Sequence, residues 1–394
     1  MINDSYPKGT KEIAERILKA AEKGKKVIIF GDSDLDGIAS VVILKELFEL
    51  LNPLYVQKKN ISVYFPDREK EGYGISKTAL DFFADQAPAL FFSVDCGITN
   101  FEEIKIAKKM GFEVIIIDHH QILGKLPKAD LIVDPKQKNE TYPFKDFAAA
   151  GLVYKVAEAT LSQTNLPQSV QEKLVELAAL ATLSDQMPIK EDNREIVDQG
   201  MDSLLTTQRE GLLALIELGE VDIQIDFHIF QKIIAPLNSF KLINHVAESY
   251  FLLTETSPKK TKSLAQKLIK RYKQKKEMNL VTVEELCQKI DKAKDNSILI
   301  FEASDYWPVP TLGSVASKLL NFYKKPVFLF KQGEKESVGS ARLPKEIDGV
   351  KAMTSCKKLL EAYGGHAPAC GCRLKNENLD KFKKCLEKYF SKDL

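Results

Sequence analysis

Short apolar runs alternate with amphipathic segments along the first half of the chain. The apolar runs are rich in β-branched and aromatic residues and predict buried strands at 26–30, 61–65, 90–94, 113–117 and 131–133. Between them, apolar residues recur at helical spacing and predict helices at 38–51, 76–83 and 101–110. Strands that alternate with helices are typical of βαβ units. The pattern therefore predicts an α/β fold whose parallel sheet has helices on both faces.

The pattern changes in the second half of the chain. Residues 147–183 are mostly helical, and 200–290 contain no convincing strand, so we interpret the latter stretch as a helical connector. A second α/β unit follows, with strands predicted at 297–301 and 326–330 and helices at 313–323, 354–363 and 379–390. A length of 394 residues suits two domains. We therefore expect an N-terminal parallel-sheet domain at 1–200, a helical connector at 201–290 and a smaller C-terminal α/β domain at 291–394.

The composition describes a soluble globular protein, with 44% hydrophobic and 28% charged residues. The net charge of +2 does not by itself indicate a nucleic-acid binder, but lysines gather at 259–276. This basic segment is either a solvated helix face or a surface that tracks phosphates. The chain has no apolar run of ~18 residues and no basic-then-apolar N-terminus. We therefore expect no membrane partner and a cytoplasmic location.

Six cysteines are spread along the chain without a CxxC pair, and the closest two, Cys370 and Cys372, are separated by one residue. Structural zinc sites prefer paired spacings of the CxxC kind. In a cytosolic protein, unpaired cysteines are usually reduced and pack as small apolar groups. We expect reduced thiols here, rather than a zinc or redox site.

Acidic residues follow several predicted strands, at the sheet edge where ligands bind in parallel α/β folds. The residues are Asp32, Asp34 and Asp36 after the first strand, Asp95 after the third, Asp118 with His119 and His120 after the fourth, and Asp185 at the end of a helix. A single aspartate at such a place is often a helix cap. Several converging carboxylates, however, repel one another unless a cation holds them. Carboxylates with imidazole suit Mn²⁺ or Mg²⁺, and two such ions promote hydrolysis at phosphorus.

These motifs, in this order, resemble the DHH phosphoesterase family, and within it the RecJ-type single-strand exonucleases. Residues 32–37, 94–98 and 118–120 resemble the first three motifs of the family, and 183–185 with 193–194 resemble the fourth. Near the C-terminus, 339–342 and 364–369 resemble the substrate-binding domain called DHHA1. The resemblance extends from about residue 25 to 390. It implies a DHH domain, a connector and a DHHA1 domain, with the active-site cleft between the two domains.

The resemblance also implies a role for each residue of the acidic cluster. The expected metal ligands are Asp34, Asp36, Asp95, His119 and Asp185, with Asp32 as a sixth. Some relatives have a histidine where this chain has Phe30, and the resemblance therefore makes Asp32 more important as a metal ligand in this chain. His120 is expected to contact the scissile phosphate, and Asp118 is expected to orient the neighbouring imidazoles.

Substrate binding is expected from two further groups of residues. Arg68 and Tyr73 lie in a segment that resembles a RecJ hallmark, and an arginine fork suits a phosphate. In the DHHA1 part, the expected substrate residues are Ser340, Arg342, Gly365 and His366. Gly365 permits a close backbone approach. These features and the length favour the RecJ type over the small-substrate phosphatases of the family.

Three features depart from the RecJ pattern. The connector reads Ile-Ala-Pro-Leu-Asn-Ser-Phe-Lys at 234–241 and lacks two arginines and a glycine that RecJ proteins usually carry. The usual Trp-His-Pro-Gly segment is altered after Trp307. We also expect no C-terminal oligonucleotide-binding domain, because the sequence stops at residue 394. These departures weaken the prediction of tight, processive DNA binding and of DNA over RNA.

The sequence thus predicts a 5′-to-3′ exonuclease for single-stranded DNA, with two divalent ions (Mn²⁺ or Mg²⁺), acting in repair, recombination or replication. The direction of cleavage comes from the resemblance. One alternative is a nanoRNase or a pAp-type phosphatase that acts on short oligonucleotides. Another is a non-catalytic replication scaffold, which the full set of acidic residues disfavours. The expected partner is single-stranded nucleic acid, DNA rather than RNA, and replication or repair proteins that bind the chain stay unidentified.

Overall fold

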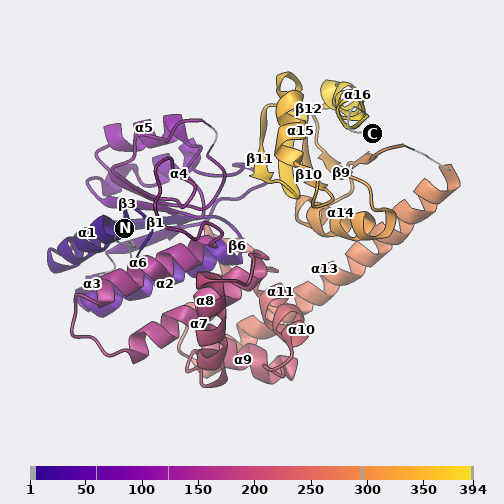
Figure 1. Cartoon of the computed structure of the whole chain (residues 1–394). Helices are drawn as coiled ribbons and strands as arrows, with labels where there is room; N and C mark the ends of the chain where they lie inside the picture. The colour runs from indigo at the N-terminus through magenta and orange to yellow at the C-terminus, as the bar shows by residue number, and fades with distance from the viewer. Residues whose placement is uncertain (1–5, 59, 123, 294–296, 392–394) are drawn as a thin grey trace. The chain divides into compact units, whose positions relative to one another are not determined.

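The computed structural model describes residues 6–58, 60–122, 124–293 and 297–391 (Figure 1). The chain forms two compact units, Met1–Tyr272 and Lys273–Leu394, whose boundary falls within the long helix α13 (Pro258–Ala293). The three-part division into 1–200, 201–290 and 291–394 stays a prediction. Residues 1–5, on which the expectation of no secretion signal rests, lie outside the described ranges. No described helix has both the length and the apolar composition needed to cross a membrane.

The first unit contains the predicted parallel sheet. Its strands are β1 (Val27–Gly31), β2 (Ile61–Tyr64), β3 (Leu90–Val94), β4 (Glu113–Ile117) and β5 (Leu131–Val133). All neighbouring strands pair in parallel, in the spatial order β2-β1-β3-β4-β5. Every residue of β1 and β3 is buried, as expected for strands covered on both faces. The α/β class predicted from the apolar runs is confirmed.

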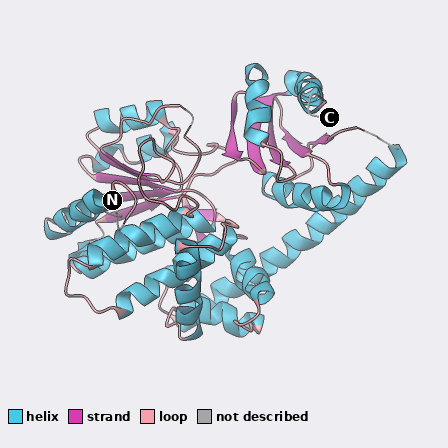
Figure 2. Ribbon diagram, viewed as in Figure 1, coloured by secondary structure: helices cyan, strands magenta, loops and turns pink. Residues whose placement is uncertain are grey.

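Helices cover both faces of this sheet (Figure 2). The side chains of the strands alternate between these faces and divide the core into two hydrophobic clusters. One face packs on α1 (Thr10–Glu22), α2 (Leu35–Leu51) and α6 (Ala149–Leu161). The other face packs on α4 (Lys77–Phe82) and α5 (Phe101–Lys109). Because successive residues of a strand point to opposite sides, a fully apolar strand such as β1 serves both cores.

The strand order places a topological switch between β1 and β3. From β1 the chain adds β2 on one side and then crosses to add β3 on the other. The connections that leave β1 and β3 therefore diverge, and the carboxyl ends of these two strands are where ligands bind in such sheets. Asp32 and Asp95 are the first residues after these strands, so the fold itself brings them to one place.

The remainder of the first unit is helical, as predicted, apart from one short hairpin. Its elements are α3 (Leu54–Lys58), η1 (Ala84–Gln86), α7 (Ser169–Ser184), α8 (Asp192–Leu205), α9 (Glu210–Gly219), α10 (Asp226–His228), η2 (Ile229–Ile234), α11 (Ala235–Leu237) and α12 (Glu248–Thr254). The hairpin, β6 (Leu242–Ile243) with β7 (Val246–Ala247), corrects the expectation that 200–290 contain no strand. Strands of two residues are too short to leave a periodic pattern.

A largely covered arginine, Arg209, ties this helical region to the sheet domain. Arg209 donates to Glu46 of α2 at 2.6 and 3.0 Å, to Glu176 of α7 at 2.9 Å and to the carbonyl of Leu253 in α12 at 2.7 Å. Burial alone would lower the pKa of Arg209, but the two glutamates keep it above its ordinary value. The guanidinium therefore fixes α2 against α7; Asp36 of the site described below lies in α2, and Asp185 directly follows α7.

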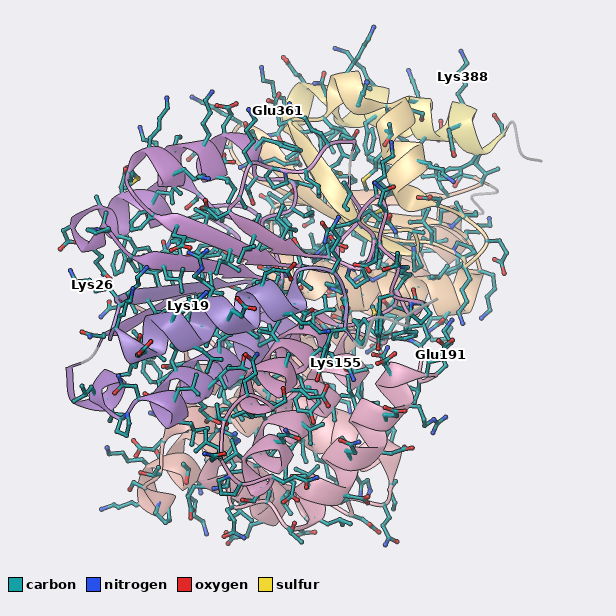
Figure 3. The ribbon with its side chains drawn as sticks, turned by 60° about the vertical axis from the view of Figure 1, so that its left-hand side comes forward. Lys19, Lys26, Lys155, Glu191, Glu361 and Lys388 are labelled. Carbon is teal, nitrogen blue, oxygen red and sulfur yellow. A yellow bond between two sulfur atoms is a disulfide. The ribbon has the colours of Figure 1, made fainter. Side chains whose placement is uncertain are left out.

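The second unit is a smaller α/β structure with a mixed sheet. Its strands are β8 (Ile300–Ser304), β9 (Val327–Gln332), β10 (Glu336–Arg342), β11 (Ala362–His366) and β12 (Ala369–Lys375), in the order β11-β12-β10-β9-β8. Only β8 and β9 pair in parallel. The helical elements are α14 (Val309–Tyr323), α15 (Gly349–Ser355), η3 (Lys357–Leu359), η4 (Asn376–Asn378) and α16 (Leu379–Phe390). Charged side chains such as Lys388 lie at the outer surface of the helices (Figure 3).

Two predictions for this unit are wrong. The predicted helix at 354–363 is instead the end of α15, the short turn η3 and the start of β11. The glycines and small residues of 362–366 disfavour a helix and suit a strand packed closely on β12. The expectation that all cysteines are reduced is also wrong, because Cys356 and Cys385 form a disulfide. Cys356 directly follows α15 and Cys385 lies in α16, in one hydrophobic cluster with Cα atoms 6.1 Å apart.

Candidate active site

The loop after β1 carries three aspartates around the start of α2. Asp34 is the N-cap of this helix, and its side chain accepts hydrogen bonds from the backbone N–H groups of Asp36 and Gly37 at 3.1 and 3.2 Å. A Cβ atom at Gly37 would lie 2.2 Å from the carbonyl oxygen of Asp32. Only glycine permits this close approach, so the loop is folded tightly on itself.

The carboxylate of Asp36 caps a second helix. Its two oxygens accept hydrogen bonds from the backbone N–H groups of Ala149 and Ala150, both at 2.7 Å. These residues begin α6, whose own N-cap residue, Ala148, has no side chain that could accept. Asp36 thus connects the starts of α2 and α6 and is buried between them.

Asp95 is aimed into the site by an unusual backbone conformation. It has a φ of 60°, in the left-handed region that non-glycine residues rarely adopt. Its N–H still donates to the carbonyl oxygen of Ile117 in β4 at 3.0 Å. The backbone therefore changes direction immediately after the last hydrogen bond between β3 and β4. Such strain is found at functional sites, where surrounding structure holds the residue in place.

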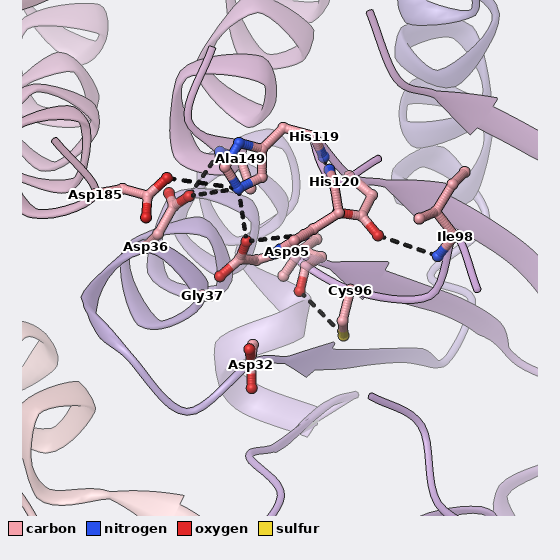
Figure 4. Close-up of polar contacts among 12 residues, drawn as sticks. Asp32, Asp36, Gly37, Asp95, Cys96, Ile98, His119, His120, Ala149 and Asp185 are labelled. Carbon is pink, nitrogen blue, oxygen red and sulfur yellow. Dashed lines mark hydrogen bonds and ion pairs between the residues drawn. The ribbon is translucent and has the colours of Figure 1, made fainter. Parts of the chain in front are cut away.

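His119 lies at the centre of the acidic cluster (Figure 4). Its Nε2 atom is 3.2 Å from a carboxylate oxygen of Asp95 and 3.7 Å from oxygens of both Asp36 and Asp185. Its Nδ1 atom lies 2.8 Å from the carbonyl oxygen of Phe147. A carbonyl can only accept, so Nδ1 carries the proton and Nε2 presents a lone pair to the carboxylates.

Asp185 completes the cluster from the end of α7. It is the C-cap of that helix, so the negative end of the helix dipole adds to its own charge. Its Oδ2 atom is buried and accepts no hydrogen bond from the part of the chain that the structure describes. Burial and the neighbouring Asp34 raise the pKa of Asp185 to about 7. A buried carboxylate oxygen without a hydrogen-bond donor, 3.7 Å from Nε2 of His119, is suited to bind a metal ion.

The remaining acids respond to their surroundings in two ways. Burial raises the pKa of Asp36 and of Asp95 well above the ordinary value, and the neighbouring carboxylates raise it further. Burial would also raise the pKa of Asp34, but the Arg68 guanidinium holds it below the ordinary value. Protons therefore compete with any cation that enters the cluster for the carboxylates of Asp36, Asp95 and Asp185.

Asp118 organises the turn that contains both histidines. It accepts hydrogen bonds from the backbone N–H groups of Ile98, His119 and His120, and from Nδ1 of His120 at 2.7 Å. Burial would lower the pKa of His120, but Asp118 raises it to about 8. His120 is therefore an imidazolium at neutral pH, and its ring also contacts the hydroxyl of Tyr73 at 3.1 Å.

Arg68 and Asp32 form a pair beside this cluster. Nε of Arg68 donates to Asp32 at 2.9 Å, and Nη2 donates to both Asp32 and Asp34. The Arg68 guanidinium lies 6.0 Å from the ring of Tyr73. The structure thus brings the two expected substrate residues of the first unit to the edge of the acidic cluster.

The donor set fits divalent metal ions. Three groups within the first unit have ligand atoms within 4.8 Å of one another: Asp36, His119 and Asp185; Asp95, Asp118 and His120; and Asp32, Asp34 and Asp95. Carboxylate oxygens with the neutral imidazole of His119 suit Mn²⁺ or Mg²⁺. All six predicted ligands lie in these groups, on four separate segments of the first unit.

Sequence reasoning missed three residues that border the cluster. Asn238, after α11, accepts from the N–H of Leu35 at 3.0 Å and donates to Ser184 at 2.9 Å. It therefore ties the aspartate loop to the end of α7. Lys136 donates its Nζ to the carbonyl of His119, and Asp134 directly follows β5. The rule that picked acidic residues at strand ends would also have selected Asp134.

The expected DHHA1 residues lie together within the second unit. Ser340 and Arg342 are on β10, Gly365 and His366 are on β11, and β12 pairs with both strands. Arg342 and His366 are both opposite Ala369 in the register. Nη1 of Arg342 donates to Ser340 at 3.1 Å. Burial lowers the pKa of Arg342, and no salt bridge to an acidic side chain is found for it among the described residues.

Comparison with known families identifies the class. The N-terminal domain of the DHH family matches residues 26–182, and the DHHA1 domain matches residues 295–392. The chain belongs to the DHH family and carries a DHHA1 domain. The resemblance inferred from the aspartate and histidine motifs is confirmed.

Within the family, the chain is similar to RecJ exonucleases. It is 32% identical over 376 residues to the single-stranded-DNA-specific exonuclease RecJ of Bacillus subtilis (strain 168), an alignment that covers 94% of this chain and 46% of that protein. A crystal structure of RecJ from Thermus thermophilus in complex with Mn²⁺ is 25% identical, with a TM-score of 0.83 over 98% of this chain and 55% of that one. A manganese-bound exonuclease RecJ structure is 26% identical, with a TM-score of 0.79 over 97% and 94%. The chain spans about half the length of the curated relatives it matches.

Proposed function

We propose that this chain hydrolyses phosphodiester bonds of single-stranded DNA as a RecJ-like exonuclease, in the 5′-to-3′ direction, with two divalent ions. The observation that carries the proposal is the convergence of His119 with Asp36, Asp95 and Asp185 at the carboxyl edge of a parallel sheet. The similarity to manganese-bound RecJ structures supports it. The cytoplasm, with its DNA, is the location that we propose.

Asp34, Asp36, Asp95, His119 and Asp185 would hold the ions, Mn²⁺ or Mg²⁺. When bound, the pair would activate a water molecule for attack at phosphorus and offset the charge of the phosphate. The hydrogen bond from Nδ1 of His119 to Phe147 keeps Nε2 available as a ligand atom.

Other residues of the chain act on the substrate itself. Asp118 keeps His120 protonated and oriented, so that the imidazolium can donate a hydrogen bond to a phosphate oxygen. Arg68, and Arg342 with His366 in the second unit, are proposed to bind further phosphates of the strand. Ser340 and Gly365 belong to the same phosphate grip, with Gly365 as the close-approach position.

A direct cleavage assay tests this function. Single-stranded DNA and RNA of several lengths, labelled at the 5′ or the 3′ end, are incubated with the protein and Mn²⁺ or Mg²⁺. We expect mononucleotides released from the 5′ end of DNA, and an Asp185→Ala variant that folds normally but does not cleave. Cleavage restricted to very short oligonucleotides would favour the nanoRNase alternative. Full activity of the Asp185→Ala variant would exclude the proposed site.

A further inference from the structure

We propose that Asp32 positions Arg68 for a phosphate group of the strand and is not a metal ligand. The sequence motif places Asp32 with Asp34 and Asp36, and its oxygens lie close enough to those of Asp34 and Asp95 to share an ion. Distance alone therefore does not separate the two roles. The bidentate pairing of Asp32 with Arg68 favours the positioning role. This inference rests on the proposed function, because it assigns a role within substrate binding.

Both carboxylate oxygens of Asp32 face the guanidinium of Arg68, whereas Asp34 meets it through Oδ2 and the oxygens of Asp36 accept from backbone N–H groups. Oδ1 accepts from the N–H of Ser33 at 2.7 Å and from Nε of Arg68 at 2.9 Å, and Oδ2 accepts from Nη2 of Arg68. This is the bidentate pairing in which a guanidinium matches a carboxylate. Asp185 differs, since its Oδ2 has no hydrogen-bond donor among the described residues. A cation placed on Asp32 would also have to approach the positive charge of Arg68.

The backbone around this pair is held on both sides. Gly37 packs against the peptide of Asp32 so closely that a side chain does not fit. The hydroxyl of Ser33 donates to the carbonyl of Pro66, two residues before Arg68. The loop of Arg68 is therefore tied to the loop of Asp32, and the backbone of Asp32 is closely packed beneath the guanidinium.

The pairing leaves one edge of Arg68 for a ligand. A guanidinium has five N–H donors. Three of them serve Asp32 and Asp34, and Nη1 makes no hydrogen bond to another residue within the described ranges. The Arg68 side chain is 41% exposed, whereas Asp32 is buried beneath it. Two fixed donors at an accessible edge suit the oxygens of a phosphate, and holding them in advance reduces the entropy lost on binding.

Metal binding separates the two roles of Asp32. Asp32→Asn keeps the size and the acceptor for Ser33, but its amide presents N–H groups to Arg68 and breaks the fork. Titration of the protein with Mn²⁺, followed by electron paramagnetic resonance, counts the bound ions. We expect Asp32→Asn to bind the same number of ions as the wild type with an affinity within about threefold. The matched control Asp185→Asn should lose an ion. Loss of an ion in Asp32→Asn to the same extent would overturn the proposal.

Kinetics test whether Asp32 acts through Arg68. On single-stranded DNA, Asp32→Asn should raise KM about tenfold, as expected for loss of a charge-assisted contact, and change kcat less. Arg68→Gln should raise KM by a similar factor. The double variant replaces the ion pair by two amides, and it should be no worse than Arg68→Gln alone. If adding Asp32→Asn to the Arg68→Gln variant raises KM by the same factor as Asp32→Asn raises it in the wild type, Asp32 does not act through Arg68.

Failure of the proposed function and failure of the role assigned to Asp32 give different results. If the wild-type protein cleaves neither DNA nor RNA of any length, the proposed function fails, and the Mn²⁺ titration still decides whether Asp32 is a ligand. If the wild-type protein cleaves but Asp32→Asn loses an ion, only the assignment of Asp32 fails. Thermal unfolding of each variant without metal confirms that all compared proteins are folded.

Discussion

Metal binding to this protein should release protons, and the affinity should therefore depend on pH. The pKa of Asp185 is raised to about 7 by burial and by Asp34. A divalent ion must displace that proton before it can bind. Because the group is an acid, the proton competes with the ion below pH 7 and is absent well above it. The Mn²⁺ affinity should thus rise as the pH increases through 7.

The size of the effect follows from this pKa. One pH unit below the pKa, roughly ten of every eleven Asp185 carboxyls are protonated, and one unit above it roughly one of eleven is. The Mn²⁺ dissociation constant should therefore fall about tenfold between pH 6 and pH 8, which corresponds to about 1.4 kcal/mol. Asp36 and Asp95 also have raised pKa values. Tenfold is therefore the smallest change that we expect.

Isothermal titration calorimetry measures both consequences. Mn²⁺ is titrated into the protein at pH 6, 7 and 8, and at pH 6 in two buffers with different ionisation enthalpies. The difference in heat between the buffers gives the number of protons released. An Asp185→Asn control should release fewer protons and bind more weakly at pH 8. Equal affinities at pH 6 and pH 8, with equal heats in both buffers, would refute the reasoning.

Two further predictions concern contacts that the sequence did not reveal. Asn238→Ala leaves the buried N–H of Leu35 without its acceptor, so the free energy of unfolding in urea should fall by about 1–3 kcal/mol. Mn²⁺ should also bind more weakly, because the side chain of Ser184 loses its hydrogen bond to Asn238. An unchanged Mn²⁺ affinity would contradict the role of Asn238 at the site. Cys356→Ser opens a loop of 29 residues closed by Cys385 and should lower the stability of the protein by about 3–4 kcal/mol. Reductant should lower the stability of the wild type similarly and leave the variant unchanged, whereas a wild type insensitive to reductant would contradict the disulfide.

The first unit was predictable because its signals are strong and local. Fully buried strands such as β1 and β3 are continuous apolar runs, and parallel strands bring their carboxyl ends to one edge. Residues that directly follow those strands, such as Asp95, could therefore be grouped by sequence position alone. Asn238 could not be, since it reaches the site from a distant segment through tertiary packing of α11.

The second unit was less predictable because its strands carry weak signals. In β10 and β12 buried and partly buried residues alternate, but the buried positions include glycine, alanine and cysteine, so the hydrophobic contrast is small. The disulfide was missed for a related reason. Cys356 and Cys385 are 29 residues apart in no recognised motif, and only the packing of α15 on α16 brings them together.

The double role of Asp36 has a consequence for how inactive variants are interpreted. Its carboxylate caps the N-terminus of α6 and is also a proposed metal ligand. The cap of α6 therefore comes from a residue of α2 and not from the residue that precedes the helix. Replacing Asp36 by alanine would leave two helix N–H groups without acceptors and would weaken folding along with metal binding. Asp185 stabilises no other element in this way, since its Oδ2 has no donor among the described residues. A catalytically inactive protein intended to trap bound nucleic acid is therefore better made at Asp185.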